Sequence, residues 1–542
     1  MKRNKFYALI LSFLSFLFSC TVFSQEGPYI RKEKSQTSLM VNGKPFLALA
    51  GEIGNSSSSS LKYMDTIWPK LKQINVNTVL VPAYWELVEP IEGQFDFTLI
   101  DGIIEKARIN DLKIVFLWFG SWKNMVSTYV PSWVKGNTGR FPLLEDVSGR
   151  RMQILSAFSE ANMQADASAF SMLMRHIKKV DVDHQTVIMM QVENEVGCGC
   201  KRDCSKLANA AYKKQVPKDL MNYLMAHKKT LIPEFKKEWE ANGAKAEGSW
   251  GEVFGPDSVG DEIFMSYYFS KYIGHVIEKG KQEYNIPMFV NASVGRFNLK
   301  MSTYPSGGPV PLVMDIWHCA APSLDILCPD IYFGNFDYLC EKYTQGGNPL
   351  FIPETRGGDV GVAHAMQAIG NYKALGFSPF FIEHYVGDPI VEVYDKFKQI
   401  SPVILGLKDC NKMIAATIDA EESQKSVVLG DYSILCDKGK KNGHDVGCAL
   451  IIENNSNEYY IMGKNINLQF YLKNSKKDMM TGILMDEEGY FNQDVWVAES
   501  RLNGDQIMID YDFVKISKEG RSGDGLKFGD KISIQHVKLY NY

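Results

Sequence analysis

The stretch TVIMMQVENEVG, residues 186–197, is an apolar run that ends at two glutamates separated by one asparagine. Such a run suits a buried strand, whereas a carboxylate is costly to bury unless something compensates its charge. The pattern therefore predicts a strand that leaves the apolar core near Glu195, whose carboxyl group faces a cleft. Because side chains alternate along a strand, we expect Glu193 and Glu195 to point to one side and Asn194 to point away. Glu193, one pleat deeper, is then a structural carboxylate.

Seven other apolar runs resemble this one and are separated by segments with helical periodicity. Strands that alternate with helices are typical of a parallel sheet. The fold class predicted by eight such units is a (β/α)8 TIM barrel, and a short edge segment at 37–46 precedes it. The predicted strands are 46–52, 76–86, 113–122, 186–195, 286–292, 324–332, 349–354 and 377–384.

Nearly every predicted strand ends in a polar or aromatic side chain. The active site of such a barrel forms at the C-terminal ends of its strands. Hydrolysis of a glycosidic bond needs one carboxyl group that gives a proton to the leaving oxygen and one ionised carboxylate that attacks or stabilises the sugar. The carboxyl groups among the strand ends therefore predict glycosidase chemistry. The predicted strands end at Glu52, Glu86, Trp122, Glu195, Asn291, Tyr332, Glu354, and Glu383 or His384.

Several motifs at these strand ends resemble a known family. QVENEVG is similar to the Asn-Glu signature on strand four of the retaining (β/α)8 glycoside hydrolases, and Glu354 ends the predicted strand seven. The chain more closely resembles glycoside hydrolase family 35, whose usual activity is β-galactosidase, in its bacterial branch with a β-rich C-terminal domain. The motifs that carry this resemblance are AGEIGNSS, VPAYWELVEPIEGQFDF, FLWFGSWKN, VPSWVK, QVENEVG, LCPDIY, FIPETR and FSPFFIE.

The resemblance implies roles for individual residues. It implies Glu195 as acid/base, Glu354 as nucleophile and Asn194 as a donor to the sugar 2-hydroxyl. Tyr332 is expected to hydrogen-bond Glu354, or else to be a packed tyrosine with a solvated hydroxyl.

Four further residues are expected at the substrate. Glu52 and Tyr84 lie where the family contacts sugar hydroxyls. Trp118 and Trp122 are candidates to stack on a sugar face, with core packing as the alternative for Trp118. Better-known family members end strand three in AEWN, whereas this chain has LWFGSW there, so its galactose recognition is expected to differ.

Beyond the barrel, the hydrophobic pattern of the chain changes at about Asn411. Short alternating segments separated by Gly, Asn and Lys turns predict a β-sandwich domain at 411–542, after a catalytic domain at 25–410. A carbohydrate-binding role of this domain is an alternative to a purely structural one.

The N-terminus predicts export. A basic start and an apolar run at 6–18 resemble a secretory signal peptide, residues 1–24, because the run is short for a membrane span. Cleavage after Ser24 predicts a periplasmic or secreted protein, and lipidation of Cys20 would instead give a membrane-anchored lipoprotein. Removal of Cys20 leaves nine of the ten cysteines, so at least one is expected to be free.

Composition narrows the possible functions. The 542 residues are 45% hydrophobic and carry a net charge of -4, with no long basic run, so nucleic-acid partners are not expected. CGCKRDC, 198–204, lacks a nearby histidine or second CxxC to complete a zinc set, and no metal or cofactor is predicted. We expect an exported retaining exo-β-glycosidase, most simply a β-galactosidase, that acts on oligosaccharides. The alternatives are another β-glycosidase or endo-glycanase, or an inactive glycan-binding protein on the same barrel.

Overall fold

The computed structural model describes residues 27–33, 36–296, 299–301, 303–419, 421–438, 446–473, 479–492, 494–507 and 525–542. The predicted signal peptide, with Ser24 and Cys20, lies outside these residues, as do residues 439–445 and 508–524 of the predicted β-sandwich domain. No helix within the described ranges is long and apolar enough to cross a membrane.

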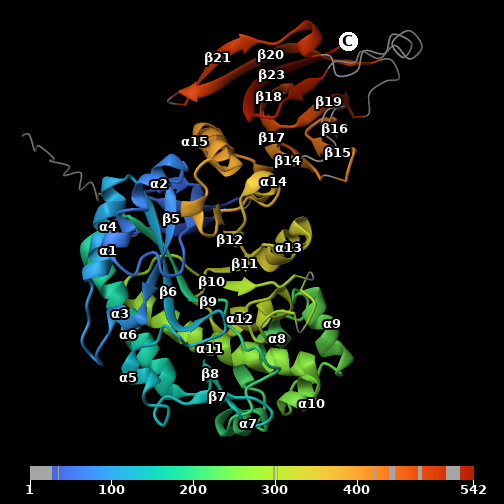
Figure 1. Ribbon diagram of the computed structural model, residues 1–542. Coiled ribbons are helices and arrows are strands. Elements are labelled where there is room, and N and C mark those ends of the chain that lie inside the picture. Colours follow the sequence, from blue (N-terminus) through green and yellow to red (C-terminus); the bar gives the residue numbers. More distant parts are fainter. Residues whose placement is uncertain are drawn as a thin grey trace, which may run out of the picture.

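All eight predicted barrel strands are present, and every neighbouring pair is parallel (Figure 1). The sheet order is β11-β10-β9-β6-β5-β4-β13-β12. A parallel bridge between Ile331 and Thr355 brings its two edges together, and the Ile331 N–H donates to the Glu354 carbonyl at 2.9 Å. The strands are β4 (Ala48–Glu52), β5 (Thr78–Tyr84), β6 (Lys113–Lys123), β9 (Val187–Asn194), β10 (Met288–Ser293), β11 (Ile326–Asp330), β12 (Ile352–Thr355) and β13 (Gly376–Pro379).

Helices surround the barrel and bury apolar side chains against it. In α4, Ile100, Ile103, Ile104 and Ala107 are buried, the spacing of one helical face. The main covering helices are α2 (Trp68–Gln73), α4 (Thr98–Ile109), α6 (Glu160–Asp181), α11 (Ser258–Glu283), α12 (Met314–Ala320), α13 (Phe336–Tyr343), α14 (Gly358–Gly370) and α15 (Pro389–Gly406). Shorter helices lie in the loops: α1 (Leu61–Met64), α3 (Trp85–Val88), α5 (Ser132–Lys135), α7 (Lys206–Tyr212), α8 (Lys218–His227), α9 (Pro233–Ala241) and α10 (Trp250–Phe254).

A small N-terminal sheet closes the end of the barrel at which the strands begin. Its antiparallel strands are β1 (Tyr29–Lys32), β2 (Thr37–Val41) and β3 (Lys44–Phe46). Leu39 and Val41 belong to the same buried cluster as Ala50, Leu80 and other side chains that fill the barrel. The interior is therefore a packed core, and the opening available to a substrate is at the C-terminal ends of the strands.

The C-terminal region consists of two antiparallel sheets, as predicted. One has the order β14-β17-β18-β23-β20-β21 and the other β15-β16-β19-β22, with a shared apolar cluster. The strands are β14 (Met413–Ile418), β15 (Gln424–Leu429), β16 (Tyr432–Asp437), β17 (Gly447–Asn455), β18 (Glu458–Lys464), β19 (Ile466–Leu472), β20 (Thr481–Asn492), β21 (Val495–Arg501), β22 (Leu526–Phe528) and β23 (Ser533–Asn541).

This β-rich region packs on the barrel helices α14 and α15 (Figure 1). Gly370 lies at the contact, where a Cβ atom would come within 2.7 Å of Leu450 Cδ1 and 2.8 Å of Ala415 Cβ. Met413, Ala415 and Leu450 belong to the same buried cluster as the outer barrel wall. The face of the β-rich region that contacts the barrel therefore continues the hydrophobic core of the barrel wall, while its two sheets enclose a separate cluster.

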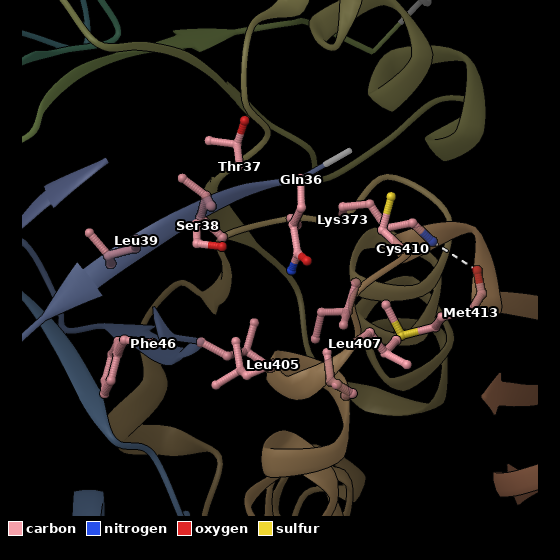
Figure 2. A pocket seen from close by; sticks show the side chains of 15 residues that line it. Gln36, Thr37, Ser38, Leu39, Phe46, Lys373, Leu405, Leu407, Cys410 and Met413 are labelled. Carbon is pink, nitrogen blue, oxygen red and sulfur yellow. Dashed lines mark hydrogen bonds between the residues drawn. The ribbon is translucent and has the colours of Figure 1, made fainter. Parts of the chain in front are cut away.

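A cavity of about 30 Å³ lies at the junction of the N-terminal sheet, α15 and the start of β14 (Figure 2). Its lining is largely apolar, with Leu39, Phe46, Leu405 and Leu407, and the Lys373 ammonium donates to the Met413 carbonyl at 2.8 Å. The space is about that of one water molecule, so this cavity is too small for a sugar.

Candidate active site

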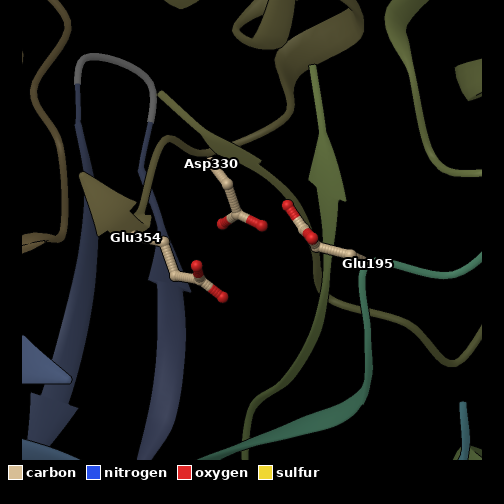
Figure 3. Close-up of side chains that lie close together, drawn as sticks. All are labelled: Glu195, Asp330 and Glu354. Carbon is tan, nitrogen blue, oxygen red and sulfur yellow. The ribbon is translucent and has the colours of Figure 1, made fainter. Parts of the chain in front are cut away.

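Three carboxyl groups meet at the open end of the barrel (Figure 3). Glu195 directly follows β9, Asp330 ends β11 and Glu354 lies in β12. Each residue offers one carboxyl oxygen within 4.8 Å of those of the other two. The structure therefore brings together the two glutamates that the sequence predicts as acid/base and nucleophile, with an aspartate beside them.

Glu354 is held by three hydrogen-bond donors. Its Oε1 accepts from Asn194 Nδ2 at 3.0 Å and from Asn291 Nδ2 at 3.3 Å. Its Oε2 accepts from the Tyr332 hydroxyl at 2.8 Å, the contact expected from the sequence. The three donors come from three different strand ends and fix the direction of the carboxylate.

Glu195 has a different environment. Burial raises its pKa to about 7, and the nearby Glu354 charge adds to this effect. Lys123, Ser293 and Asp330 act in the opposite direction. A carboxyl group with this pKa holds a proton near neutral pH and can give it to a leaving group.

Two other carboxyl groups at the site are also buried. Burial and the charge of Glu354 raise the pKa of Asp330 and of Glu52 well above their usual range. Asp330 Oδ2 accepts from Asn291 Nδ2 at 2.8 Å. Both carboxyl oxygens of Glu52 are fully buried and have no hydrogen-bond partner among the described residues.

Asn194 lies between Glu354 and a lysine. Its Oδ1 accepts from Lys123 Nζ at 2.8 Å, while its Nδ2 donates to Glu354. Lys123 has only 5% of its surface exposed, and its ammonium lies 5.0 Å from the centre of the Phe119 ring. Asn194 therefore points into the site together with Glu195.

This arrangement corrects the predicted alternation along strand four. Glu193 does not share a side with Glu195. It is fully buried, and its carboxylate accepts from the backbone N–H groups of Ser121 and Trp122 at 3.0 and 2.6 Å. The physical reason is the backbone: Glu193 has φ 64° and Glu195 has φ 44°, left-handed values that interrupt the pleat. The expected structural character of Glu193 nevertheless agrees with its contacts.

An irregularity in β6 accompanies this change. Trp118 pairs with Val192, but the next pair is Lys123 with Asn194, so β6 carries extra residues. Gly120 is required there, because a Cβ atom would lie 2.3 Å from Trp118 Nε1 and 2.7 Å from Glu193 Oε1. The extra length of β6 places Lys123 level with Asn194.

The two tryptophans expected at the sugar are completely buried. Trp118 Nε1 donates to Asp166 at 2.8 Å, and Trp122 Nε1 donates to the Leu155 carbonyl at 3.1 Å. Trp122 also packs against Tyr272, with ring centres 4.5 Å apart. In this structure both rings support the barrel wall and present no open face to a sugar.

Tyr84 and two other strand-end residues also lie in supporting positions. The buried Tyr84 hydroxyl donates to the Asn55 carbonyl at 2.7 Å. Glu383 accepts from Gly54 N–H and Ser57 Oγ, which ties the ends of β13 and β4 together. Glu86 forms a half-exposed ion pair with Lys135 and does not join the three carboxyl groups.

A hollow of about 470 Å³ opens beside Glu195. Ser293, which hydrogen-bonds Glu195, is part of its lining. Met125, in a turn where both Asn124 (φ 51°) and Met125 (φ 65°) are left-handed, contributes another wall. The remaining lining residues are Cys198, Gly199, Cys200, Lys201, Ser258, Glu262, Met301, Thr303, Tyr304, Pro305 and Ser306.

Three residues of the site were missed or not given a role by sequence reasoning: Lys123, Asn291 and Asp330. Asn291 and Asp330 lie at predicted strand ends, so their position was a usable signal. Lys123 follows the predicted end of strand three by one residue, and only the extra length of β6 brings it to Asn194.

The three-carboxyl cluster has the spacing of a cation site. Glu354 already accepts three hydrogen bonds, and Asp330 accepts one from Asn291. These hydrogen bonds already use the oxygens of Glu354 and Asp330 that a cation would need, and Glu195 is suited to carry a proton. The cysteines at 198, 200 and 204 are all free thiols.

Two parts of the chain match models of protein families. Residues 58–270 match a glycoside hydrolase family 42 model described as "Beta-galactosidase", and residues 390–511 match a domain of unknown function, DUF5597. The barrel is similar to the β-galactosidases. A β-galactosidase of Xanthomonas manihotis is 28% identical over 170 residues, 30% of this chain and 25% of that relative. The chain thus matches a quarter of that relative's length.

Solved structures with a similar arrangement include the β-galactosidase from Bacillus circulans sp. alkalophilus, with a TM-score of 0.44 and 16% identity over 66% of this chain and 57% of that one. Another is the catalytic domain of β-amylase from Paenibacillus polymyxa, with a TM-score of 0.45 and 12% identity over 62% of this chain and 92% of that one.

Proposed function

We propose that the protein is a retaining exo-β-galactosidase. The observation that carries this proposal is the contrast between two neighbouring carboxyl groups. Burial raises the pKa of Glu195 to about 7, whereas Glu354 is oriented by three donors. Their oxygens lie within 4.8 Å, and retaining enzymes keep their two carboxyl groups about 5 Å apart.

In the proposed reaction the Glu354 carboxylate attacks the anomeric carbon and forms a glycosyl ester. The bond to the leaving oxygen breaks at the same time, and Glu195 gives its proton to that oxygen. Glu195 then takes a proton from water, whose oxygen attacks the anomeric carbon and releases Glu354. Each glutamate therefore returns to its starting protonation state.

The substrate that we propose is an oligosaccharide with a terminal β-galactosyl unit. Galactose is supported by the match at 58–270. The leaving group must lie on the Glu195 side, because it receives the proton from that residue. The hollow beside Glu195 is of a size that binds a saccharide. Asn194, which donates to Glu354, is proposed to donate to the galactosyl 2-hydroxyl as well.

Three finer assignments are part of the proposal. The motifs at the strand ends support membership of family 35, although the matched model belongs to family 42. Residues 1–24 support export, either to the periplasm or medium or, through Cys20, to a membrane surface. The C-terminal sheets are proposed to support the barrel through α14, where the two regions share a core.

A panel of aryl β-glycosides tests the function. We expect cleavage of the β-galactoside in preference to the glucoside, xyloside and mannoside, and NMR should detect β-galactose as the first product. Glu354→Gln should lose activity by about 10⁴-fold or more and keep its melting temperature. Preferential cleavage of another glycoside would change the sugar assignment. Galactose binding without cleavage would instead support the glycan-binding alternative.

A further inference from the structure

The buried Lys123 is an unusual neighbour for a glycosidase site because it brings a positive charge among carboxyl groups. Its Nζ lies 2.8 Å from Asn194 Oδ1. Its charge lowers the pKa of Glu52, Glu195 and Asp330 and so opposes the effect of burial. Lysine is rarely buried to 5% exposure unless it is paired, so its position demands an explanation.

The chemistry of the Asn194 amide supplies that explanation. An amide has one end that accepts hydrogen bonds and one end that donates them. A lysine ammonium can only donate and a carboxylate can only accept, so the amide satisfies both neighbours in one orientation alone. In that orientation Nδ2 faces Glu354 and the sugar that would occupy the site.

We propose that Lys123 is a positioning residue that sets the Asn194 amide with its donor toward the nucleophile and the substrate. This inference rests on the proposed function, because it assigns a task to the Asn194 donor in the glycosidase reaction. The turn after β6 supports it: Lys123 N–H donates to the Val126 carbonyl and Asn124 N–H donates to the Asn194 carbonyl. The backbones of the two residues are therefore held side by side.

The test is a double-mutant cycle of Lys123→Met and Asn194→Ala, with kcat and KM measured on an aryl β-galactoside. Lys123→Met alone should lower kcat by about tenfold or more and change KM much less, because the hydrogen bond from Asn194 to the sugar 2-hydroxyl strengthens in the transition state. In the Asn194→Ala background the same change should cost only about twofold, because Lys123 acts through that amide. Equal losses in both backgrounds would overturn the proposal.

Two further variants separate positioning from folding. Lys123→Arg keeps a cationic donor and should recover part of the lost kcat. Lys113→Met is the matched control: it lies at the other end of β6, where its Nζ donates to the Gln185 carbonyl at 2.8 Å, and should leave kcat unchanged. If Lys123→Arg is no better than Lys123→Met, the donor role is wrong.

The pH profile gives a readout that a purely structural lysine would not move. Glu354, Glu52, Asp330 and Lys123 are the titratable groups that interact with Glu195. Loss of the Lys123 charge should raise the pKa of Glu195 and move the alkaline limb of kcat/KM to higher pH, whereas Lys123→Arg should leave the limb in place. An unmoved limb in Lys123→Met would contradict the proposal.

Binding separates this proposal from the proposed function. Calorimetry with a galactose-configured iminosugar should show weaker binding to Lys123→Met in the wild-type background and little further loss in the Asn194→Ala background. A wild-type protein that binds this compound but cleaves no glycoside would overturn the proposed function. The double-mutant cycle measured by binding would then still test whether Lys123 acts through Asn194. A protein that neither binds nor cleaves would overturn both.

Discussion

Glu195 and Glu354 have the same side chain but different surroundings. Glu195 is half-buried, and burial and the neighbouring charge of Glu354 keep its proton in place near neutral pH. Glu354 faces two asparagine amides and one tyrosine hydroxyl, all of which donate to it. Two carboxyl groups with such different neighbours are suited to the acid and the nucleophile of one reaction.

The acid role of Glu195 predicts a dependence on the leaving group. Glu195→Ala should lose far more activity on a galactosyl disaccharide than on a dinitrophenyl galactoside, because an acidic phenol departs without a proton. Added azide should restore turnover of the second substrate by entering the space that the carboxyl group vacated. Steady-state kinetics with both substrates checks this.

Glu193→Ala is the matched control for this measurement. Its carboxylate binds the backbone of β6 and lies near Asp166, so the variant should lose stability and show no azide rescue. If azide rescues Glu193→Ala but not Glu195→Ala, Glu193 is the general acid and Glu195 is the structural residue.

At the scale of elements, the strands were predictable and their irregular ends were not. Apolar runs such as 286–292 and 349–354 revealed all eight barrel strands, because burial on both faces leaves a clear pattern. The direction of Asn194 followed from left-handed backbone at Glu193 and Glu195, which a regular pleat does not anticipate. Lys123 reached the site through extra residues in β6 that depend on packing around Gly120.

The residues that line the hollow beside Glu195 indicate where the leaving group of the substrate binds. Tyr304 and Ser293 both line the hollow, and an aromatic ring is suited to pack on the apolar face of a saccharide. Tyr304→Ala should raise KM for a galactosyl disaccharide by about tenfold and leave β-galactosyl fluoride unchanged, since fluoride does not fill the hollow. The control is Tyr63→Ala on α1, where the side chain is exposed. An equal effect on both substrates would place Tyr304 on the galactosyl side instead.

At the scale of the whole molecule, buried carboxyl groups make stability depend on pH. Burial raises the pKa of Glu195, Glu262 and Asp486 to about 7. The unfolded chain releases these protons at lower pH, so the folded state binds more protons between about pH 4.5 and 7. Their contribution to stability is present below that range and is lost as pH rises through 7.

Glu262 allows a direct test of this dependence. It is buried in α11 and accepts from Gly307 N–H at 2.9 Å, a bond that glutamine can also accept. The wild-type free energy of unfolding should fall between pH 5 and 8, and in Glu262→Gln this fall should be smaller by up to about 3 kcal/mol. Denaturant unfolding across that pH range measures the difference. Glu278→Gln, exposed on the same helix, should leave the wild-type dependence in place. A Glu262→Gln curve parallel to that of the wild type would contradict the assigned pKa.

The most direct test of the central claim is to identify the residue that becomes bonded to the sugar. A 2-deoxy-2-fluoro-β-galactosyl fluoride should form the glycosyl ester and hydrolyse slowly, because the fluorine at carbon two disfavours both transition states. Peptide mapping by mass spectrometry should then place one label on Glu354, and Glu354→Gln should take up none. A label on Glu195 or Asp330, or turnover of aryl galactosides with an inverted first product and no label, would contradict the account.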